Sequence, residues 1–338
     1  MIGAVQRNNL LQRQKLVLLI LTIFFSLVCA ELVLRAEGYE PLGPVQQQYQ
    51  SIEPGGRFLE LDSPVGYSLI PGAYKITFID GYTFQVTHSS DRLRITHPLN
   101  DSVTEKDAVW ILGDSFTYGW ELNDAETYPW LLQNALPEFE IVNFGVPGNG
   151  TVQSYLQIQD ALQRRTKPKI IVLAYASFHD ERNTLARTWR KYFPVPVNSQ
   201  GDVYLPVARL DQQGNARYGV SELEYREFPL VRSLALANLI DNIYNIQVDR
   251  YQQPSHAVTK AVIKDLYNAA TQNQARFVLA GIYSDPLTQE MLQFANAQGI
   301  ETVDISVPVD PPTFFPDAHP RANANLQFAQ KLLPRLSR

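Results

Sequence analysis

The sequence of 338 residues contains a single cysteine, Cys29, and no strongly basic segment. One cysteine cannot form an internal disulfide and leaves no cysteine-based zinc site. The five histidines, at positions 88, 97, 179, 256 and 319, show no HExxH or comparable ligand spacing, so no structural metal is expected. The net charge is −5 and no local block of Lys and Arg offsets it, which argues against a nucleic-acid partner.

Apolar sequence, in contrast, is plentiful. Hydrophobic residues make up 45% of the chain and charged residues 19%, an ordinary balance for a globular protein. The length allows one large domain or two smaller ones, with a substantial core.

The longest apolar run lies near the N-terminus, in KLVLLILTIFFSLVCAELVLR. Residues 16–30 are uncharged and mostly apolar, and Glu31 follows them. A helix of roughly 20 such residues crosses the core of a bilayer. Basic residues at positions 7, 13 and 15 precede the run, and such a flank stays in the cytoplasm. We therefore expect a cytoplasmic tail and signal-anchor over residues 1–35, with the remainder on the extracytoplasmic side.

Two other interpretations of this segment stay open. The sequence VCA before Glu31 satisfies a small-residue cleavage rule, which would make the segment a removable signal peptide and the chain a secreted one. A lipoprotein site at Cys29 fits less well because Val28 is bulky where a small residue is expected. The segment could also be a buried helix of a soluble protein.

Turn residues and changes in the hydrophobic pattern divide the rest of the chain into segments. Residues 36–57 are polar and rich in Pro and Gly, which predicts a linker. Residues 58–106 contain short alternating runs separated by turn sequences, which predicts a small antiparallel β-rich element. The main domain is expected over residues 107–338, with an insertion at about 184–230 that contains hairpin-like runs and could cover a substrate cleft.

In the main domain, short apolar runs alternate with helical segments. Strands are predicted at 108–112, 140–144, 169–175, 276–282 and 301–306, and helices at 126–136, 152–165, 257–273, 286–297 and 322–336. This alternation predicts an α/β fold with a mainly parallel sheet covered by helices on both faces. Ligands in such sheets bind beyond the carboxyl ends of the strands.

Three motifs fall at such positions. The first predicted strand runs directly into Gly113-Asp114-Ser115. A serine hydroxyl is a weak nucleophile, which needs a base, a group that orients the base and donors for an oxyanion. The second strand ends in NFGVPGNG, and the sequence DAHP precedes the last predicted helix. Each motif alone is a common loop sequence.

Together, in this order, GDSFTYG, NFGVPGNGT and DAHP resemble the SGNH (GDSL-type) hydrolase superfamily over roughly residues 107–338. The resemblance implies a flavodoxin-like three-layer α/β/α sandwich that acts on esters without a metal or organic cofactor. It implies that Ser115 is the nucleophile, His319 the general base and Asp317 the residue that orients the imidazole. The backbone N–H groups of Ser115 and Gly145 would bind the oxyanion.

Two departures from the family pattern concern the same site. Pro316 stands where many members have the acidic residue, so that Asp317 lies two positions before the histidine. The third family block usually supplies an asparagine, and here the sequence AYASFHDERN places His179 at that position. Three outcomes are open: His179 supplies the third oxyanion donor, Asn183 takes its place, or the enzyme is slow or specialised.

The function expected from these features is that of a membrane-anchored, outward-facing serine esterase. Its partners would be the membrane and an ester substrate, with O-acetyl groups on an envelope or extracellular polysaccharide as one such substrate. Two alternatives stay open: an acyltransferase that delivers the acyl group to a sugar hydroxyl with the same triad, and a non-catalytic glycan-binding or scaffold protein that retains the fold.

Overall fold

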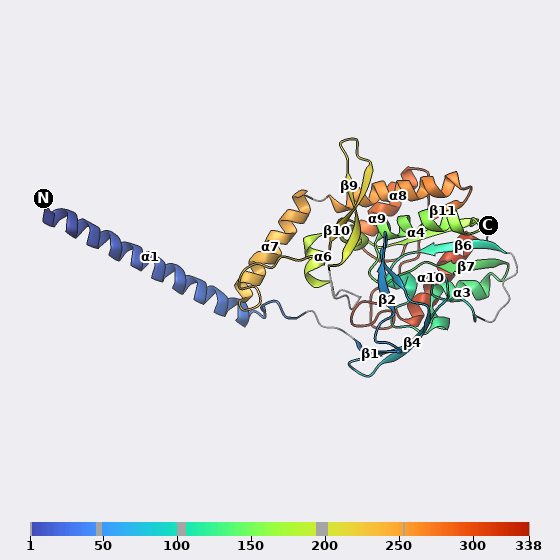
Figure 1. Cartoon of the computed structure of the whole chain (residues 1–338), viewed down its shortest axis with the longest axis horizontal. Coiled ribbons are helices and arrows are strands. Elements are labelled where there is room, and N and C mark those ends of the chain that lie inside the picture. The colour runs from blue at the N-terminus through green and yellow to red at the C-terminus, as the bar shows by residue number, and fades with distance from the viewer. Residues whose placement is uncertain (1, 45–48, 100–105, 194–201, 253, 338) are drawn as a thin grey trace. The chain divides into compact units, whose positions relative to one another are not determined.

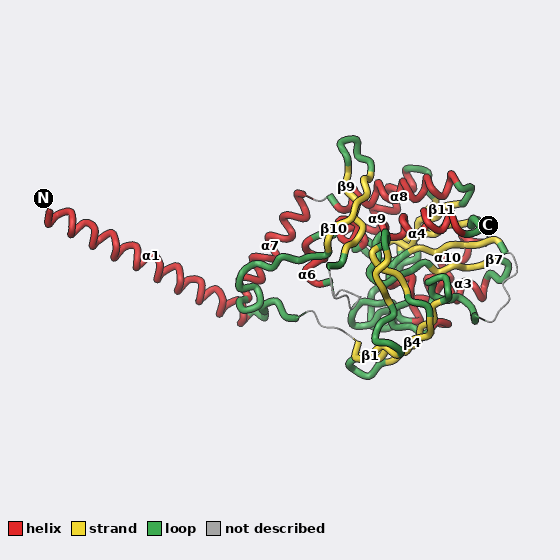
Figure 2. Tube along the Cα trace, viewed as in Figure 1, coloured by secondary structure: helices red, strands yellow, loops and turns green. Residues whose placement is uncertain are grey.

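A computed structural model describes residues 2–44, 49–99, 106–193, 202–252 and 254–337 (Figure 1). The chain divides into two compact units. Residues 1–45 and 225–248 form the first, and residues 46–224 and 249–338 form the second. Figure 2 shows that the first unit is built from helices and loops, whereas every strand that the structure describes lies in the second.

A five-stranded parallel sheet organises the second unit. Its order is β7 (Phe139–Asn143), β6 (Asp107–Leu112), β8 (Ile170–Tyr175), β11 (Arg276–Gly281) and β12 (Glu301–Asp304). Numbered along the chain from β6, this is the order 2-1-3-4-5 of flavodoxin-like sheets, in which ligands bind where the order reverses. That point lies between β6 and β8, at the end of β6.

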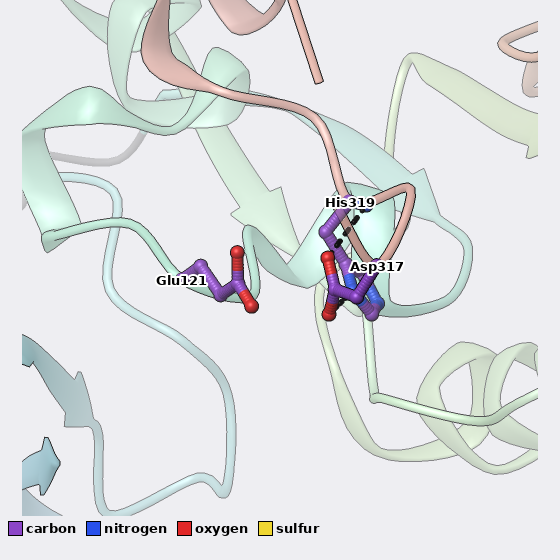
Figure 3. A group of neighbouring side chains, drawn as sticks. All are labelled: Glu121, Asp317 and His319. Atoms are coloured by element: carbon purple, nitrogen blue, oxygen red, sulfur yellow. Dashed lines mark hydrogen bonds and ion pairs between the residues drawn. The ribbon is translucent and has the colours of Figure 1, made fainter. Parts of the chain in front are cut away.

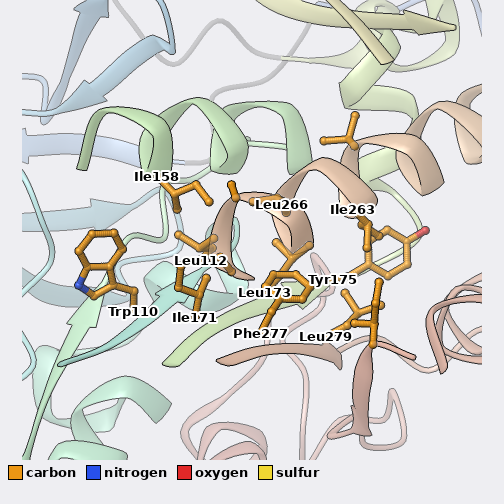
Figure 4. Packing of buried hydrophobic residues seen from close by; sticks show 14 of the residues in the cluster. Trp110, Leu112, Ile158, Ile171, Leu173, Tyr175, Ile263, Leu266, Phe277 and Leu279 are labelled. Carbon is orange, nitrogen blue, oxygen red and sulfur yellow. The ribbon is translucent and has the colours of Figure 1, made fainter. Parts of the chain in front are cut away.

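Helices cover both faces of the sheet, because the strands carry apolar residues on both sides. Helices α4 (Thr151–Arg164), α8 (Ser255–Gln272) and α9 (Pro286–Ala297) pack on one face, where Figure 4 shows the side chains between sheet and helices. Helices α3 (Tyr128–Ala135) and α10 (Ala322–Leu336) pack on the other. The predicted three-layer fold is confirmed, and the ends of its predicted strands and helices agree with the structure to within two residues.

The segment before the sheet is β-rich. Strands β1 (Tyr49–Glu53), β4 (Gly72–Phe78) and β5 (Thr83–His88) form an antiparallel sheet, and β2 (Leu59–Asp62) pairs with β3 (Gly66–Leu69). Strand β1 falls within residues 36–57, where the sequence predicts only a linker. Residue Arg94 bridges to both His88 and Asn143, and so joins this element to the edge strand β7.

The segment between β8 and α8 begins with two short helices, α5 (His179–Thr184) and α6 (Arg187–Tyr192). A hairpin of β9 (Tyr204–Leu210) and β10 (Ala216–Glu222) follows them. Both strands lie in the predicted insertion at 184–230. The cleft-covering role suggested for this insertion stays a prediction.

The first unit contains α1 (Ile2–Ala36) and most of α7 (Ala235–Gln252), up to residue 248. Residues 12–36 of α1 are long and apolar enough to cross a membrane, and none of the most apolar part is buried. The structure therefore does not support the interpretation of this segment as a buried helix. The backbone N–H groups of Ala235 and Leu236 donate to the Glu31 carboxylate at 3.0 and 2.9 Å, and Arg35 donates to the carbonyl of Ser233. Glu31 thus caps the N-terminus of α7.

Candidate active site

The serine predicted as nucleophile lies at the point where β6 gives way to a helix. Asp114 caps α2 (Ser115–Tyr118) by accepting a hydrogen bond from the N–H of Phe116 at 3.0 Å. A Cβ atom on Gly113 would lie 2.1 Å from Thr117 Oγ1, so this tight strand-to-helix turn requires glycine. The turn presents Ser115 at the carboxyl edge of the sheet.

The three predicted catalytic side chains form one hydrogen-bonded chain. Ser115 Oγ lies 3.1 Å from His319 Nε2. Asp317 Oδ2 lies 2.7 Å from His319 Nδ1, and Asp317 Oδ1 accepts the backbone N–H of His319 at 3.1 Å. Because an ionised carboxylate only accepts, Nδ1 carries the proton and Nε2 is left to accept the proton of the serine. This is the arrangement that a serine nucleophile and its base require.

A fourth side chain, Glu121, contacts Asp317 from the turn after α2. Figure 3 shows Glu121, Asp317 and His319 as neighbours, and their potential ligand atoms lie within 4.8 Å of one another. Glu121 is only 5% exposed. Burial, followed by the charge of Asp317 and a hydrogen bond to it, raises the pKa of Glu121 to about 9. Burial also acts to raise the pKa of Asp317, but its bonds to His319 outweigh burial and lower it.

The backbone of this turn is held by a buried arginine from the β-rich element. Arg94, 1% exposed, donates to the carbonyls of Tyr118, Gly119 and Leu122, and its Nε lies 3.1 Å from an oxygen of Asp124. The Tyr82 hydroxyl donates to the carbonyl of Glu121 at 2.7 Å. With these contacts the turn holds Glu121 at φ +67°, a left-handed conformation that costs a non-glycine residue about 1 kcal/mol.

Behind the serine, Asp114 is fully buried in a polar network. Its Oδ2 accepts from Arg182 at 2.8 Å and lies 3.5 Å from His179 Nε2. Burial alone would raise the pKa of Asp114, but the neighbouring His179 and Arg182 hold it well below its usual range. The acidic residue of the GDS motif therefore fixes the turn as an anion.

The two other residues predicted for the oxyanion hole, Gly145 and His179, differ in their hydrogen bonds. The N–H of Gly145 donates to Asn143 Oδ1 at 2.9 Å. His179 is fully buried, and its two ring nitrogens lie 3.5 Å from Thr151 Oγ1 and from Asp114 Oδ2. Nε2 of His179 has no hydrogen-bond partner among the residues that the structure describes. Both roles stay predictions, and that of Gly145 requires its bond to Asn143 to be shared or given up.

The remaining alternative for the third donor, Asn183, is held elsewhere. Its amide oxygen accepts from the N–H of Val152 and its amide nitrogen donates to Thr259. Another amide, that of Asn149, is fully buried and has no hydrogen-bond partner for either side-chain atom among the residues that the structure describes. The carbonyl of Asn149 accepts from Arg182, the residue that also binds Asp114. The hydrogen-bonding capacity of the Asn149 amide is therefore unused by the described residues.

The side chains of Glu121, Asp317 and His319 are also a set that a metal ion could use. Nδ1 of His319 bonds to Asp317, however, and Nε2 bonds to Ser115, so the ring offers no further nitrogen as a ligand. The two ring nitrogens of His319 are thus engaged in hydrogen bonds to Asp317 and Ser115.

Comparison with known proteins finds no family model and no curated protein that matches the chain. Solved structures do match. The solved structures that it resembles include GDSL-type and SGNH-type hydrolases. A lipolytic protein of the G-D-S-L family from Veillonella parvula is 12% identical, with a TM-score of 0.40, over 68% of this chain and 98% of the other.

Two esterases show a similar likeness. EstA from Pseudoalteromonas sp. is 12% identical, with a TM-score of 0.40, over 69% of this chain and 97% of the other. AlinE4, an SGNH-hydrolase family esterase, is 15% identical, with a TM-score of 0.36, over 70% and 97%. These are likenesses in structure alone.

Sequence reasoning missed Glu121, Asn149 and Arg182. Asn149 lies within the glycine-rich motif NFGVPGNG, in which only glycine was assigned a role in the oxyanion hole. Arg182 lies three residues after the predicted His179. Glu121 directly follows Trp120, close to the GDS motif, but its partner Asp317 lies near the other end of the chain. No local signal marks that contact.

Proposed function

We propose that the chain is a serine ester hydrolase, with Ser115 as nucleophile, His319 as general base and Asp317 as the residue that orients the imidazole. The observation that carries this proposal is the continuous chain from Ser115 Oγ through His319 to Asp317, at 3.1 and 2.7 Å. The similar solved structures named as esterases agree with it.

In the first half of the reaction, Ser115 Oγ attacks the ester carbonyl while its proton passes to His319 Nε2. The imidazolium that results is stabilised by Asp317, whose lowered pKa keeps it ionised. The carbonyl oxygen then carries a negative charge and needs donors. Ser115 is the first residue of α2, so its N–H has no acceptor within that helix and is one such donor.

Collapse of the tetrahedral intermediate breaks the bond between the carbonyl carbon and the alcohol oxygen. His319 then gives its proton to the departing alcohol, and an acyl-serine remains. In the second half water attacks this acyl group, with His319 again as the base. The His319 side chain is 21% exposed, so the base is within reach of solvent.

The substrate class that we propose is an O-acyl ester, with O-acetyl groups on an envelope or extracellular polysaccharide as its natural form. The support is the apolar α1 segment, which fits a signal-anchor that places the second unit outside the cytoplasm. An esterase outside the cytoplasm would meet such esters.

The test uses the full chain in detergent with nitrophenyl acetate, butyrate and octanoate. Wild type is expected to turn over the shorter esters and to react covalently with a fluorophosphonate probe. Ser115→Ala removes both activities, whereas Ser154→Ala, which deletes another buried serine hydroxyl, keeps them. Equal turnover by wild type and Ser115→Ala would refute the proposal.

A second assay uses acetylated polysaccharide with and without an added sugar acceptor. Release of free acetate in the absence of acceptor supports hydrolysis. Acetylated product that forms only with acceptor would show that the chain is a transferase.

A further inference from the structure

The carboxyl groups of Glu121 and Asp317 lie within 4.8 Å of each other, and both are largely buried. Two ionised carboxylates repel each other, and a hydrogen bond between them requires one proton. The contact between Glu121 and Asp317 is therefore informative about protonation, since only one of the two groups can carry that proton.

The surrounding donors decide which group is ionised. Asp317 accepts from both Nδ1 and the backbone N–H of His319, and these bonds favour its charged form. Glu121 faces Asp317, Arg321 and Asp80, of which only Arg321 favours a negative charge. The proton therefore resides on Glu121, which is consistent with the rise in its pKa to about 9.

The turn that carries Glu121 is built to hold this side chain in place. Its left-handed backbone is maintained by the three carbonyl bonds of Arg94 and by the hydroxyl of Tyr82. This strain accompanies a buried polar side chain that reaches the loop before α10. Strained backbone that places a polar group at a candidate site favours a functional reason.

We propose that Glu121 is a positioning residue of the catalytic site, which in its protonated form donates a hydrogen bond to Asp317 and so holds Asp317 against His319. The proposal rests on the proposed function of the Ser115 site. It extends the chain of contacts to four side chains: Glu121, Asp317, His319 and Ser115.

The hydrogen bond that we propose from Glu121 to Asp317 depends on pH. Below about pH 9, Glu121 keeps its proton and donates to Asp317. Above that pH both groups are anions, and their repulsion displaces Asp317 from His319. Tyr82, which contacts this turn from the segment between β4 and β5, has its pKa raised by burial above the ordinary value of 10.0, so it does not account for a transition near pH 9.

The test compares three variants of the full chain in detergent. Glu121→Gln keeps a donor of the same shape that does not ionise. Glu121→Ala removes the donor. Glu126→Gln is a matched control, because that carboxylate bonds to Asn123 on the neighbouring turn.

The first readout is kcat and KM for nitrophenyl acetate from pH 6 to pH 10, with Ser115→Ala as the background. Wild type and Glu126→Gln are expected to lose kcat above about pH 9, whereas Glu121→Gln keeps its neutral rate across this range. Glu121→Ala lowers kcat about tenfold to a hundredfold with little change in KM. An unchanged alkaline fall in Glu121→Gln would overturn the inference, and so would full activity of Glu121→Ala.

The second readout does not depend on turnover. Nuclear magnetic resonance of chain labelled with 15N-histidine follows the Nδ1–H of His319, assigned with a His319→Gln sample. This resonance is expected to shift near pH 9 in wild type and not in Glu121→Gln. If wild type shows this shift but no esterase activity, the proposed function fails and the positioning contact stands. A shift that persists in Glu121→Gln, or is absent from wild type, overturns the inference.

Discussion

The pair of Asp114 and Arg182 offers a quantitative test of how the serine turn is held. Asp114→Asn preserves the side-chain shape and the oxygen that accepts from Phe116, but removes the charge that Arg182 meets at 2.8 Å. Asp114 is fully buried and the Arg182 side chain is 15% exposed. Breaking one partner of a buried pair costs about 3–5 kcal/mol. We expect about 3 kcal/mol, because Arg182 keeps its bond to the carbonyl of Asn149.

Removal of both charges should cost less than the sum of the two single losses. Arg182→Met alone leaves Asp114 ionised and buried, with His179 as its neighbour. The double variant leaves no unpaired charge, so the coupling energy should reach at least about 2 kcal/mol.

The assay is urea unfolding of the full chain in detergent at pH 7, read by tryptophan fluorescence. All four tryptophans, at positions 110, 120, 130 and 189, lie in the second unit, so the signal reports the unit that contains the site. Single losses that add to within about 0.5 kcal/mol would show that the two residues act independently and would refute this reasoning.

Three further predictions concern the same unit. Asn149→Ala should lower kcat for nitrophenyl acetate about a hundredfold or more if its amide binds the oxyanion, and a rate unchanged by Asn149→Ala but reduced by His179→Ala would assign that donor to His179. Burial lowers the pKa of His88 to about 4, so the unfolded chain takes up a proton from about pH 6.5 downward before the folded chain does. The free energy of unfolding should therefore fall by about 3 kcal/mol between pH 6.5 and 4. If the free energy of unfolding of His88→Gln falls by the same amount over this range, the prediction is wrong. Gly145→Ala should prevent folding of the second unit, seen as loss of its near-ultraviolet circular dichroism, because the new Cβ would lie 2.3 Å from the backbone nitrogen of Tyr118; a native spectrum would show that the backbone yields.

The layers of this fold could be predicted because their signals are local. Apolar runs such as Val109–Leu112 end at turn residues, and each is followed by a helix with its own periodicity. The resemblance of the motifs to a known family then implied that Ser115 and His319 meet, and the structure has Ser115 Oγ 3.1 Å from His319 Nε2.

The contacts that tune the site could not be predicted in this way. The approach of Glu121 to Asp317 depends on a left-handed turn that is held by Arg94 from another element. The surroundings of the His179 ring depend on how α5 packs against α4 and on the burial of Asp114. Each arises from tertiary packing, and a single sequence carries no periodic signal for it.

The carboxylate that caps α7 belongs to the first residue after the VCA sequence. A peptidase that cut between Ala30 and Glu31 would leave Glu31 at the head of the liberated polypeptide, with both carboxylate oxygens still able to receive the amides of Ala235 and Leu236. The contact between Glu31 and the N-terminus of α7 would thus remain after cleavage. A tethered form and a shed form would then share this contact and differ in the lipid-facing stretch ahead of it.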